Sequence, residues 1–352
     1  MAYRNFILIN LAVSVISGAA IAQEAAPQRT NLIDRAEQVA EVSARVRPIM
    51  ALDPQRKVIV DGEMPWSSMI LAAREIVFKP GSRLVFHESL VNTAAHFFIV
   101  ADRLVVEDPN NPGVITWARS SPSAPGDRGR AAAGPPGAGH GAGGGAGAAG
   151  APGQTGAEGT DSPALTLMAR TLVNGGVVVD FRGGSGGAGG VGQVGGNGGG
   201  GAQGTPARQS RTRGPFNATI WNPWCDAGPG QGGRGGDGGA GGPGGLGGTG
   251  GDGGNVTLVS LNEHLPVFTQ SIRVNIGGGD GGAGGAGGAG GPGGPGGPEG
   301  QLANFCNSAG RHGGPGSGGT TGPFGNKGAP GKAGQSFIAP LNNEQFAALF
   351  GF

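Results

Sequence analysis

The most constraining feature of this sequence is a glycine pattern with a period of three. Residues Gly230 to Asn255 repeat Gly-Gly-X, and the X positions are Arg234, Asp237, Ala240, Pro243, Leu246, Thr249 and Asp252. A polyproline II helix has three residues per turn, whereas α-helices and strands have periods of 3.6 and 2. Each position of the triplet becomes a stripe along such a rod, and bare glycine stripes let neighbouring backbones approach closely.

This type of helix has no internal hydrogen bonds, so its backbone N–H and C=O groups need partners on neighbouring chains or rods. Packing against similar rods supplies those partners. We therefore predict that residues 230–255 form one rod of a polyglycine II helix bundle.

Composition limits the alternatives. The 352 residues include 81 glycines and 26 prolines, a level at which disorder and collagen-like folds must both be considered. The strict period argues against a flexible linker, because a linker needs no register. The net charge of +1 provides no field that would attract nucleic acid or an anionic membrane, so neither is expected as a partner.

The N-terminus has the features of a secretory signal peptide. Arg4 precedes the apolar run Phe6–Ala20, and Ala20-Ile21-Ala22 fits a cleavage site, so residues 1–22 are predicted to be removed after Ala22. That run is too short to span a bilayer, and no later stretch could span one. We expect a secreted or periplasmic protein.

Short β-rich runs make up much of the remaining sequence, among them Ile70–Phe78, Phe98–Val106, Leu165–Val173 and Val256–Leu261. A recurring strand–turn–strand unit with insertions between copies favours a small β-solenoid or β-helix base. An antiparallel sandwich is the second choice. Residues 31–47 have helical spacing, and Pro48 is expected to end that helix.

The expected fold class is mostly β plus polyglycine II, with short terminal helices. Its parts are a signal peptide (1–22), an N-terminal helical segment (23–56), a discontinuous β base (57–125, 163–182, 255–276 and 336–340), three glycine-rich polyglycine II hairpins (126–162, 183–254 and 277–335) and a C-terminal helix (341–352).

Two of the three insertions contain a non-glycine segment near their middle, residues 206–225 and 301–312. Each insertion leaves a strand and must return to the next, so three hairpins would give about six rods of roughly 60 to 85 Å. Cys225 and Cys306 lie in these segments, which the hairpins bring to one end. We predict a disulfide between them, worth roughly 4 to 5 kcal/mol in the chain-entropy model; two separate thiols are the alternative.

The glycine tracts cover about half of the chain, at residues 126–161, 183–201, 228–254, 277–300 and 313–335. They resemble springtail antifreeze proteins and the distal tail-fibre adhesins of T-even-like phages, which bundle Gly-Gly-X rods within one chain. The exported β-plus-glycine layout is also similar to bacterial proteins described as collagen-like. Residues 141–159 and 313–334 also fit Gly-X-Y, so packing within one chain and a trimeric collagen helix both stay open.

Motifs that suggest chemistry are weak. Ser185 in Gly183–Gly187 matches the Gly-x-Ser-x-Gly nucleophile elbow of serine hydrolases, but such a match is expected by chance in a glycine-rich chain. Asp237 and Asp252 match half of a calcium-binding repeat, and with Asp280 they are interpreted as a solvated stripe. The carboxylates near strand ends are Glu107, Asp108 and Asp180. The histidines lack zinc-ligand spacing. No catalytic residue, metal or cofactor is expected.

The two non-glycine segments, 206–225 and 301–312, are the expected tips of the hairpins, and the first of these tips has an unusual composition. Between Ala207 and Cys225 it concentrates arginine and aromatic residues, and the second tip adds two more; the candidate binding residues are Arg208, Arg211, Arg213, Phe216, Trp221, Trp224, Phe305 and Arg311. Aromatic and arginine side chains dominate binding hot spots, and tryptophan also stacks on sugar rings. The alternative is an apolar plug that closes the end of the bundle.

The leading hypothesis is an exported, non-enzymatic structural or adhesion-type protein whose disulfide-linked tips bind a surface glycan or protein ligand. One alternative is a purely structural matrix or envelope spacer. A second is ice binding, suggested by the Ala283, Ala286 and Ala289 stripe. A third is a β-helix enzyme that acts on glycans. The oligomeric state is left open.

Overall fold

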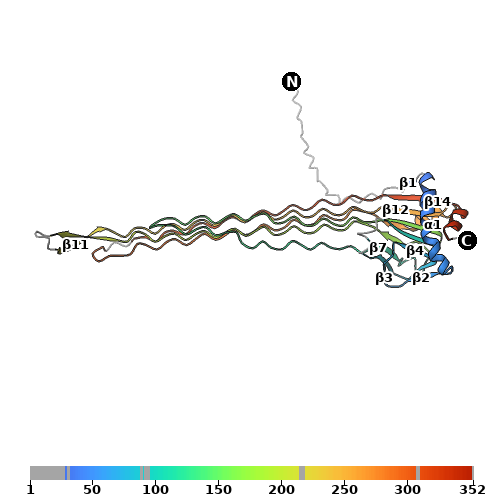
Figure 1. The fold of residues 1–352 in the computed structure, drawn as a ribbon, viewed down its shortest axis with the longest axis horizontal. Coiled ribbons are helices and arrows are strands. Elements are labelled where there is room, and N and C mark those ends of the chain that lie inside the picture. The colour runs from blue at the N-terminus through green and yellow to red at the C-terminus, as the bar shows by residue number, and fades with distance from the viewer. Residues whose placement is uncertain are drawn as a thin grey trace, which may run out of the picture.

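The computed structural model describes residues 28–29, 32–87, 90, 96–213, 219–306 and 310–350. For residues 28–29, 32–39, 211–213 and 219–223 it describes the backbone alone. A β-sheet base lies at one end, and a long bundle of extended rods runs from it to a small hairpin at the other end (Figure 1). In the described part of the chain, no helix is long and apolar enough to cross a membrane.

The base contains two sheets in which all strands are parallel. In spatial order the first sheet consists of β1 (Gln28–Arg29), β14 (Ser336–Leu341), β12 (Val256–Leu261), β8 (Ala164–Val173), β6 (His96–Val106), β4 (Ile70–Phe78) and β2 (Lys57–Val60). The second consists of β13 (Arg273–Asn275), β9 (Val178–Asp180), β7 (Val114–Trp117), β5 (Arg83–Phe86) and β3 (Glu63–Trp66). The glycine-rich rods are inserted between these strands.

Two hydrophobic layers hold the base together. The inner core includes Phe86 and Phe97, whose rings stack with centroids 4.3 Å apart, and Phe181, whose ring meets Phe86 edge-on. The outer layer lies between the seven-stranded sheet and two helices, α1 (Leu32–Leu52) and α4 (Asn343–Phe350). A short third helix, α3 (Leu265–Ser271), precedes β13 and buries Phe268 in the inner core.

The predicted β-solenoid or β-helix base is therefore wrong. The base is a layered, α/β-like arrangement of two all-parallel sheets, with helices over one face of the larger sheet. The antiparallel sandwich is wrong as well, because every pairing in these two sheets is parallel. The continuous apolar run Ile70–Ala73 in β4 is buried at all four positions, which is the pattern of a parallel strand covered on both faces.

The N-terminal helix also differs from the expectation. Pro48 was expected to end it, but α1 continues through this residue to Leu52. Val42, Val46 and Met50 recur every four residues and are all buried against the sheet and α4, so packing outweighs the backbone hydrogen bond that proline cannot donate. The Ser43 hydroxyl and the Arg47 Nε both donate to the Ala348 carbonyl at 2.9 Å, which ties α1 to the end of α4.

In the part of the chain that the structure describes, six extended rods form the bundle, and they pack within one chain. They are rod 1 (130–138), rod 2 (141–162), rod 3 (183–204), rod 4 (230–254), rod 5 (277–300) and rod 6 (311–335). Odd-numbered rods run away from the base and even-numbered rods return to it. At about 3.1 Å per residue, a 24-residue rod spans about 75 Å. Figure 1 shows the resulting shape, which is a stalk several times longer than the base.

Hydrogen bonds between rods follow one rule. Within each triplet, one residue donates its N–H to the rod two places later, as Gly235 does to Gly314 at 2.9 Å; these residues form the forward stripe. The next residue donates to the preceding rod, as Gly236 does to Gly199 at 2.8 Å, and forms the back stripe. The third residue, such as Arg234, belongs to the face stripe. Rods 1, 3 and 5 thus form one layer and rods 2, 4 and 6 the other.

This rule explains where glycine is needed. A Cβ on forward-stripe Gly235 would lie 1.9 Å from the Gly294 carbonyl oxygen in the next rod. A Cβ on back-stripe Gly236 would lie 1.9 Å from the Gly145 oxygen, two rods earlier. Real contacts of this kind start near 3.4 Å. Rods 3, 4 and 5 have neighbours on both sides and need two glycine stripes. Rods 2 and 6 lie at the edges and need one.

The collagen alternative is resolved by the same rule. Residues 141–159 and 313–334, which also fit Gly-X-Y, are rods 2 and 6, and their single glycine stripe faces the other rods of the same chain. The segment that leads from the base to rod 1 runs along the outside of the bundle (Figure 1), with Pro122 and Pro125 next to Gly187 and Gly190 of rod 3. The forward-stripe donors of rod 1 begin at Ala131, and Pro122 and Pro125, which continue that stripe toward the base, have no N–H to donate.

Acidic side chains fix the alignment of the rods. The Asp237 carboxylate accepts the backbone N–H of Ser317 at 2.7 Å, and the Asp252 carboxylate accepts that of Lys332 at 2.7 Å. Both pairs are 80 residues apart in sequence, which locks rod 6 to rod 4 in one register. The interpretation of Asp237 and Asp252 as a merely solvated stripe is therefore incomplete, because each caps a backbone donor.

Candidate binding tip

The far end of the stalk contains residues 206–213, 219–227, 301–306 and 310, which we call the distal tip. Its first segment contains β10 (Arg208–Arg213) and β11 (Thr219–Ala227), which pair as an antiparallel hairpin. In this hairpin Gln209 lies opposite Cys225, and Ser210 lies opposite Trp224. The sequence analysis treated this segment as a tip without assigning strands to it.

The predicted disulfide is confirmed. Cys225 and Cys306 are bonded, with Cα atoms 5.0 Å apart and a sequence separation of 81 residues. The bond joins β11 to the segment that connects rods 5 and 6. Cys225 is exposed, whereas Cys306 is buried, with its sulfur within 3.7 Å of the Arg208 and Ala227 carbonyl oxygens. Disulfides persist in oxidising compartments, which agrees with the expected export of the chain.

Backbone and side-chain hydrogen bonds reinforce this link. The Ala207 N–H donates to the Gln301 carbonyl at 2.9 Å, just where the first segment leaves rod 3. The Gln209 amide nitrogen donates to the Asn304 carbonyl. Phe305 has a positive φ of 70°, a conformation that is uncommon for a residue with a side chain, and it directly precedes Cys306. The second segment is therefore held against the first at Gln301, Asn304 and Cys306.

Three large apolar side chains of the distal tip are exposed to solvent. Trp224 is 46% exposed, Leu302 is 59% exposed and Phe305 is 61% exposed. A plug that closed the end of the bundle would bury such side chains. Isolated apolar residues on a surface are ordinary, but three on so small a tip, all in segments joined by one disulfide, make it the candidate contact surface.

The structure places only some of the predicted binding residues. Arg208 is exposed and forms an ion pair with Asp226 at 3.3 Å, so it is not an isolated cation. Arg311 is exposed where rod 6 begins, and its carbonyl accepts the Gly232 N–H. For Arg211, Arg213 and Trp221 only the strand backbone is described. Phe216 lies outside the described residues.

Leu302 was missed by the sequence analysis. It lies in the segment already identified as a tip, between Gln301 and Ala303. A signal was present, since a leucine in an exposed connection between two glycine-rich rods has no core to enter. The predicted binding residues were all arginine or aromatic, so a leucine was not among them.

The remaining candidates do not come together as a reaction centre. Ser185 lies exposed on the face stripe of rod 3, not at a strand-to-helix turn. Asp180 is held by ion pairs to Arg119 and Arg182, both at 2.9 Å. Burial raises the pKa of Asp180, but the hydrogen bond from Arg182 and the charge of Arg119 outweigh it and keep this pKa below its ordinary value. Among the described residues, no cluster of three or more His, Cys, Asp or Glu could hold a metal ion.

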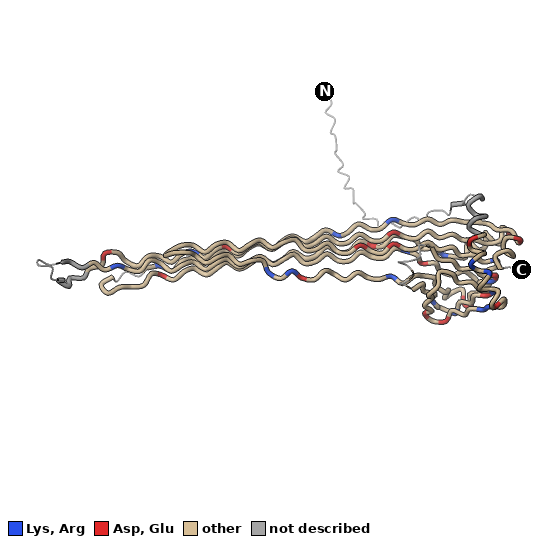
Figure 2. The backbone as a smooth tube through the Cα atoms, viewed as in Figure 1, with Lys and Arg blue, Asp and Glu red and all other residues tan. Residues whose placement is uncertain are grey.

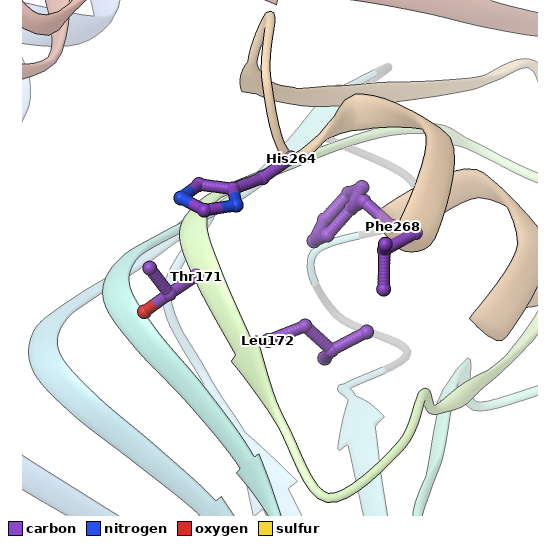
Figure 3. A pocket seen from close by; sticks show the side chains of 5 residues that line it. Thr171, Leu172, His264 and Phe268 are labelled. Carbon is purple, nitrogen blue, oxygen red and sulfur yellow. The ribbon is translucent and has the colours of Figure 1, made fainter.

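A small pocket lies in the base between β8 and α3 (Figure 3). Its volume is about 150 Å³, and it is lined by Thr171, Leu172, His264, Val267 and Phe268. Its polar groups are the Thr171 hydroxyl and the His264 imidazole, which lies 3.8 Å from the Glu263 carboxylate. Ligand pockets usually measure about 300 to 1,000 Å³, so we assign no ligand to this one.

Charged residues are few and widely separated along the rods, and the rods form long uncharged stretches (Figure 2). The rods therefore have no strong field to steer a highly charged ligand. The distal tip differs, because residues 206–227 include three arginines, Arg208, Arg211 and Arg213, and one acidic residue, Asp226, which pairs with Arg208.

No protein-family model matches the chain, and no curated protein sequence matches it. Among solved structures, it aligns with a springtail antifreeze protein from Granisotoma rainieri, described as a nine polyproline type II helical bundle whose crystal waters match the ice lattice. The two are 28% identical over 53% of this chain and 93% of the other, with a TM-score of 0.07. A TM-score this low carries no argument about fold or function.

Proposed function

We propose that this chain is an exported, non-enzymatic stalk protein that binds a surface glycan or protein through its distal tip. The observation that carries the proposal is the exposure of Trp224, Leu302 and Phe305 at the end of a rigid rod bundle about 75 Å long. A disulfide holds the two segments that carry these side chains together. Export rests on the signal peptide in residues 1–22, which lie outside the described residues.

The construction of the tip suits binding. Aromatic side chains contribute large contact areas at a low cost in conformational entropy, and tryptophan also packs on the apolar faces of sugar rings. The disulfide and the hydrogen bonds to Gln301 and Asn304 order this surface before any ligand arrives. Prior ordering of this kind increases affinity, because less freedom is lost on binding.

A triple variant, Trp224→Ala with Leu302→Ala and Phe305→Ala, tests the proposal. Binding of the protein to glycan arrays and to immobilised cell-surface extracts is measured before and after the substitutions. We expect at least a tenfold loss, about 1.4 kcal/mol, since hot-spot residues commonly contribute more than this. Leu246→Ala with Phe324→Ala is the matched control, because both side chains are exposed, at 52% and 78%, but lie on the rods.

The second candidate function is a structural spacer in a matrix or envelope, which the long uncharged stretches of the rods favour. The same experiment separates the two. If the tip variant binds every surface as well as the unmodified protein does, the binding proposal is wrong and the spacer function remains. If the rod control loses binding and the tip variant does not, the contact surface lies on the rods.

A further inference from the structure

Rod 5 presents a row of backbone donors that have no acceptor among the residues described by the structure. They are the forward-stripe amides of Gly281, Gly284, Gly287, Gly290, Gly293 and Gly296. In rods 1 to 4 the corresponding amides donate to the rod two places later. Rod 5 would need a seventh rod to do the same.

Rod 6 presents a matching row of acceptors. The back-stripe carbonyls of Gly313, Gly316, Gly319, Gly322, Gly325, Gly328 and Gly331 receive no hydrogen bond from any described residue. The equivalent carbonyls of rod 5 accept from rod 6, as Gly297 does from Gly313 at 2.9 Å. The two rows run side by side, and they define the hydrogen-bonding position of one more rod that would run from base to tip.

Side chains of rod 6 stand in that position. Its forward stripe consists of His312, Pro315, Gly318, Thr321, Phe324, Lys327, Pro330 and Ala333. In rod 5 a Cβ at this stripe would lie 1.9 to 2.0 Å from carbonyl oxygens of the next rod, as at Gly284 and Gly281. By the same geometry, the Cβ atoms of Thr321, Phe324 and Lys327 would collide with the backbone of a seventh rod.

The opposite edge of the bundle is also lined by side chains in place of glycine. The back stripe of rod 2 carries Ala148, Ala151, Gln154, Ala157 and Thr160, where rods 3 to 6 have mainly glycine. A rod placed two positions before rod 2 would meet these Cβ atoms. The Ala148 N–H of this stripe donates to the Ala132 carbonyl of rod 1 at 2.9 Å, whereas the Ala151 N–H donates to the Gln193 side chain at 3.0 Å.

We propose that these edge side chains close the bundle at six rods and exclude glycine-rich rods of a second copy of this chain. The two edges are complementary in hydrogen bonding, because rods 5 and 6 end the lattice that rods 1 and 2 begin. With glycine at both edges, copies could add side by side without limit, as unprotected strand edges do in β-proteins. The inference does not depend on the distal tip.

A seventh rod supplied in the same chain tests the proposal. A copy of residues 277–300 is fused behind Phe352 through a flexible Gly/Ser linker of about 20 residues, which spans about 25 Å. The fused segment starts at the base, runs in the required direction and is present at a high effective concentration. Two measurements report whether the fused segment docks. They are the rate at which a protease cleaves it and the rate of amide exchange at Gly284, Gly287 and Gly290 of the host.

Three hosts for this fusion are compared. The first is the unmodified protein. The second has an opened edge, with Pro315, Thr321, Phe324, Lys327 and Pro330 changed to glycine. The third is a control in which five face-stripe residues of the same rod, Ser317, Thr320, Pro323, Asn326 and Ala329, are changed to glycine.

We expect the fused segment to be cleaved at least about tenfold more slowly in the opened host than in the other two, since docking makes many backbone hydrogen bonds. The proposal is overturned if the segment docks equally in the unmodified protein, or if the opened edge leaves it fully cleavable. Should the opened host fail to fold, amide exchange of the unmodified protein without a fusion still tests the proposal. Its Gly284, Gly287 and Gly290 amides must exchange faster than those of Gly285, Gly288 and Gly291, and equal protection would overturn the proposal.

Discussion

Replacing one interior glycine by alanine should open the bundle locally. Gly239, on the back stripe of rod 4, is the most informative site. A Cβ there would lie 2.0 Å from the Ala148 oxygen and 2.5 Å from the Ala148 carbonyl carbon. Both atoms are backbone, so no flexible side chain can move aside. To reach an ordinary contact near 3.4 Å, rods 2 and 4 must separate by about 1.4 Å.

That separation breaks hydrogen bonds. The Gly147 and Gly150 amides donate from rod 2 to the Asp237 and Ala240 carbonyls at 2.9 and 2.8 Å, on either side of Gly239. A shift of this size takes both distances beyond the range of a hydrogen bond. Overpacking costs about 1 to 3 kcal/mol, and each lost bond costs about 0.5 to 1.5 kcal/mol. We expect Gly239→Ala to destabilise the bundle by about 2 to 6 kcal/mol.

Amide hydrogen exchange is the suitable assay, because the rods and the base need not unfold together. A loss of 2 kcal/mol accelerates exchange of the Gly236, Gly239 and Gly242 amides by about 30-fold. The matched control is Gly318→Ala on rod 6, where the nearest atom would be 3.8 Å away. That variant should be neutral or more stable by up to about 1 kcal/mol. If the two variants exchange within about twofold of each other, the packing rule for the glycine stripes is wrong.

Three further predictions concern the tip, the register and the base. Reducing the disulfide, or changing Cys306 to Ser, should alter Trp224 fluorescence and tip exchange while rod amides such as Gly245 stay protected; loss of rod protection would show that the disulfide supports the whole stalk. Asp252→Ala should cost about 0.5 to 1.5 kcal/mol, because the Lys332 N–H loses its acceptor, whereas Asp252→Asn should cost less; equal losses in amide-exchange stability would contradict this. The pKa of Asp180 is below its ordinary value of 3.8, so its stabilising effect is complete above about pH 4 and is lost as the pH falls through the folded pKa. An acid titration of unfolding, followed by Trp117 fluorescence, should lose this component in Asp180→Asn; an identical titration would refute it.

Some of the candidate site could be predicted from the sequence. Cys225 and Cys306 lie in the two non-glycine segments of period-three tracts, and hairpins bring such segments to one end. The disulfide followed from that argument. The exposure of Phe305 did not follow in the same way, because an aromatic side chain in a tip can plug the bundle or face solvent. In the folded tip Leu302 and Phe305 are exposed, while Cys306 of the same segment is buried and the Asn304 carbonyl accepts a hydrogen bond from Gln209.

The base was harder to predict. Strand-like runs such as Ile70–Phe78 were visible, but whether a sheet face is covered depends on elements far away in sequence. Here α1 and α4, separated by nearly the whole chain, cover the same face through Val46 and Phe346. The same packing carries α1 past Pro48, where local propensity alone predicts an end.

By itself, the sequence determined the period of the rods, because only a three-residue repeat keeps glycine on one side of an extended chain, and it determined that two cysteines share the tip. Tertiary structure alone decided which glycines are indispensable. Gly239 and Gly318 look alike in sequence, yet a Cβ added at Gly239 would lie 2.0 Å from a backbone carbonyl oxygen, whereas one added at Gly318 would have its nearest atom 3.8 Å away. The physical reason is that a rod's neighbours, and not its own residues, set how close a Cβ comes to the next backbone.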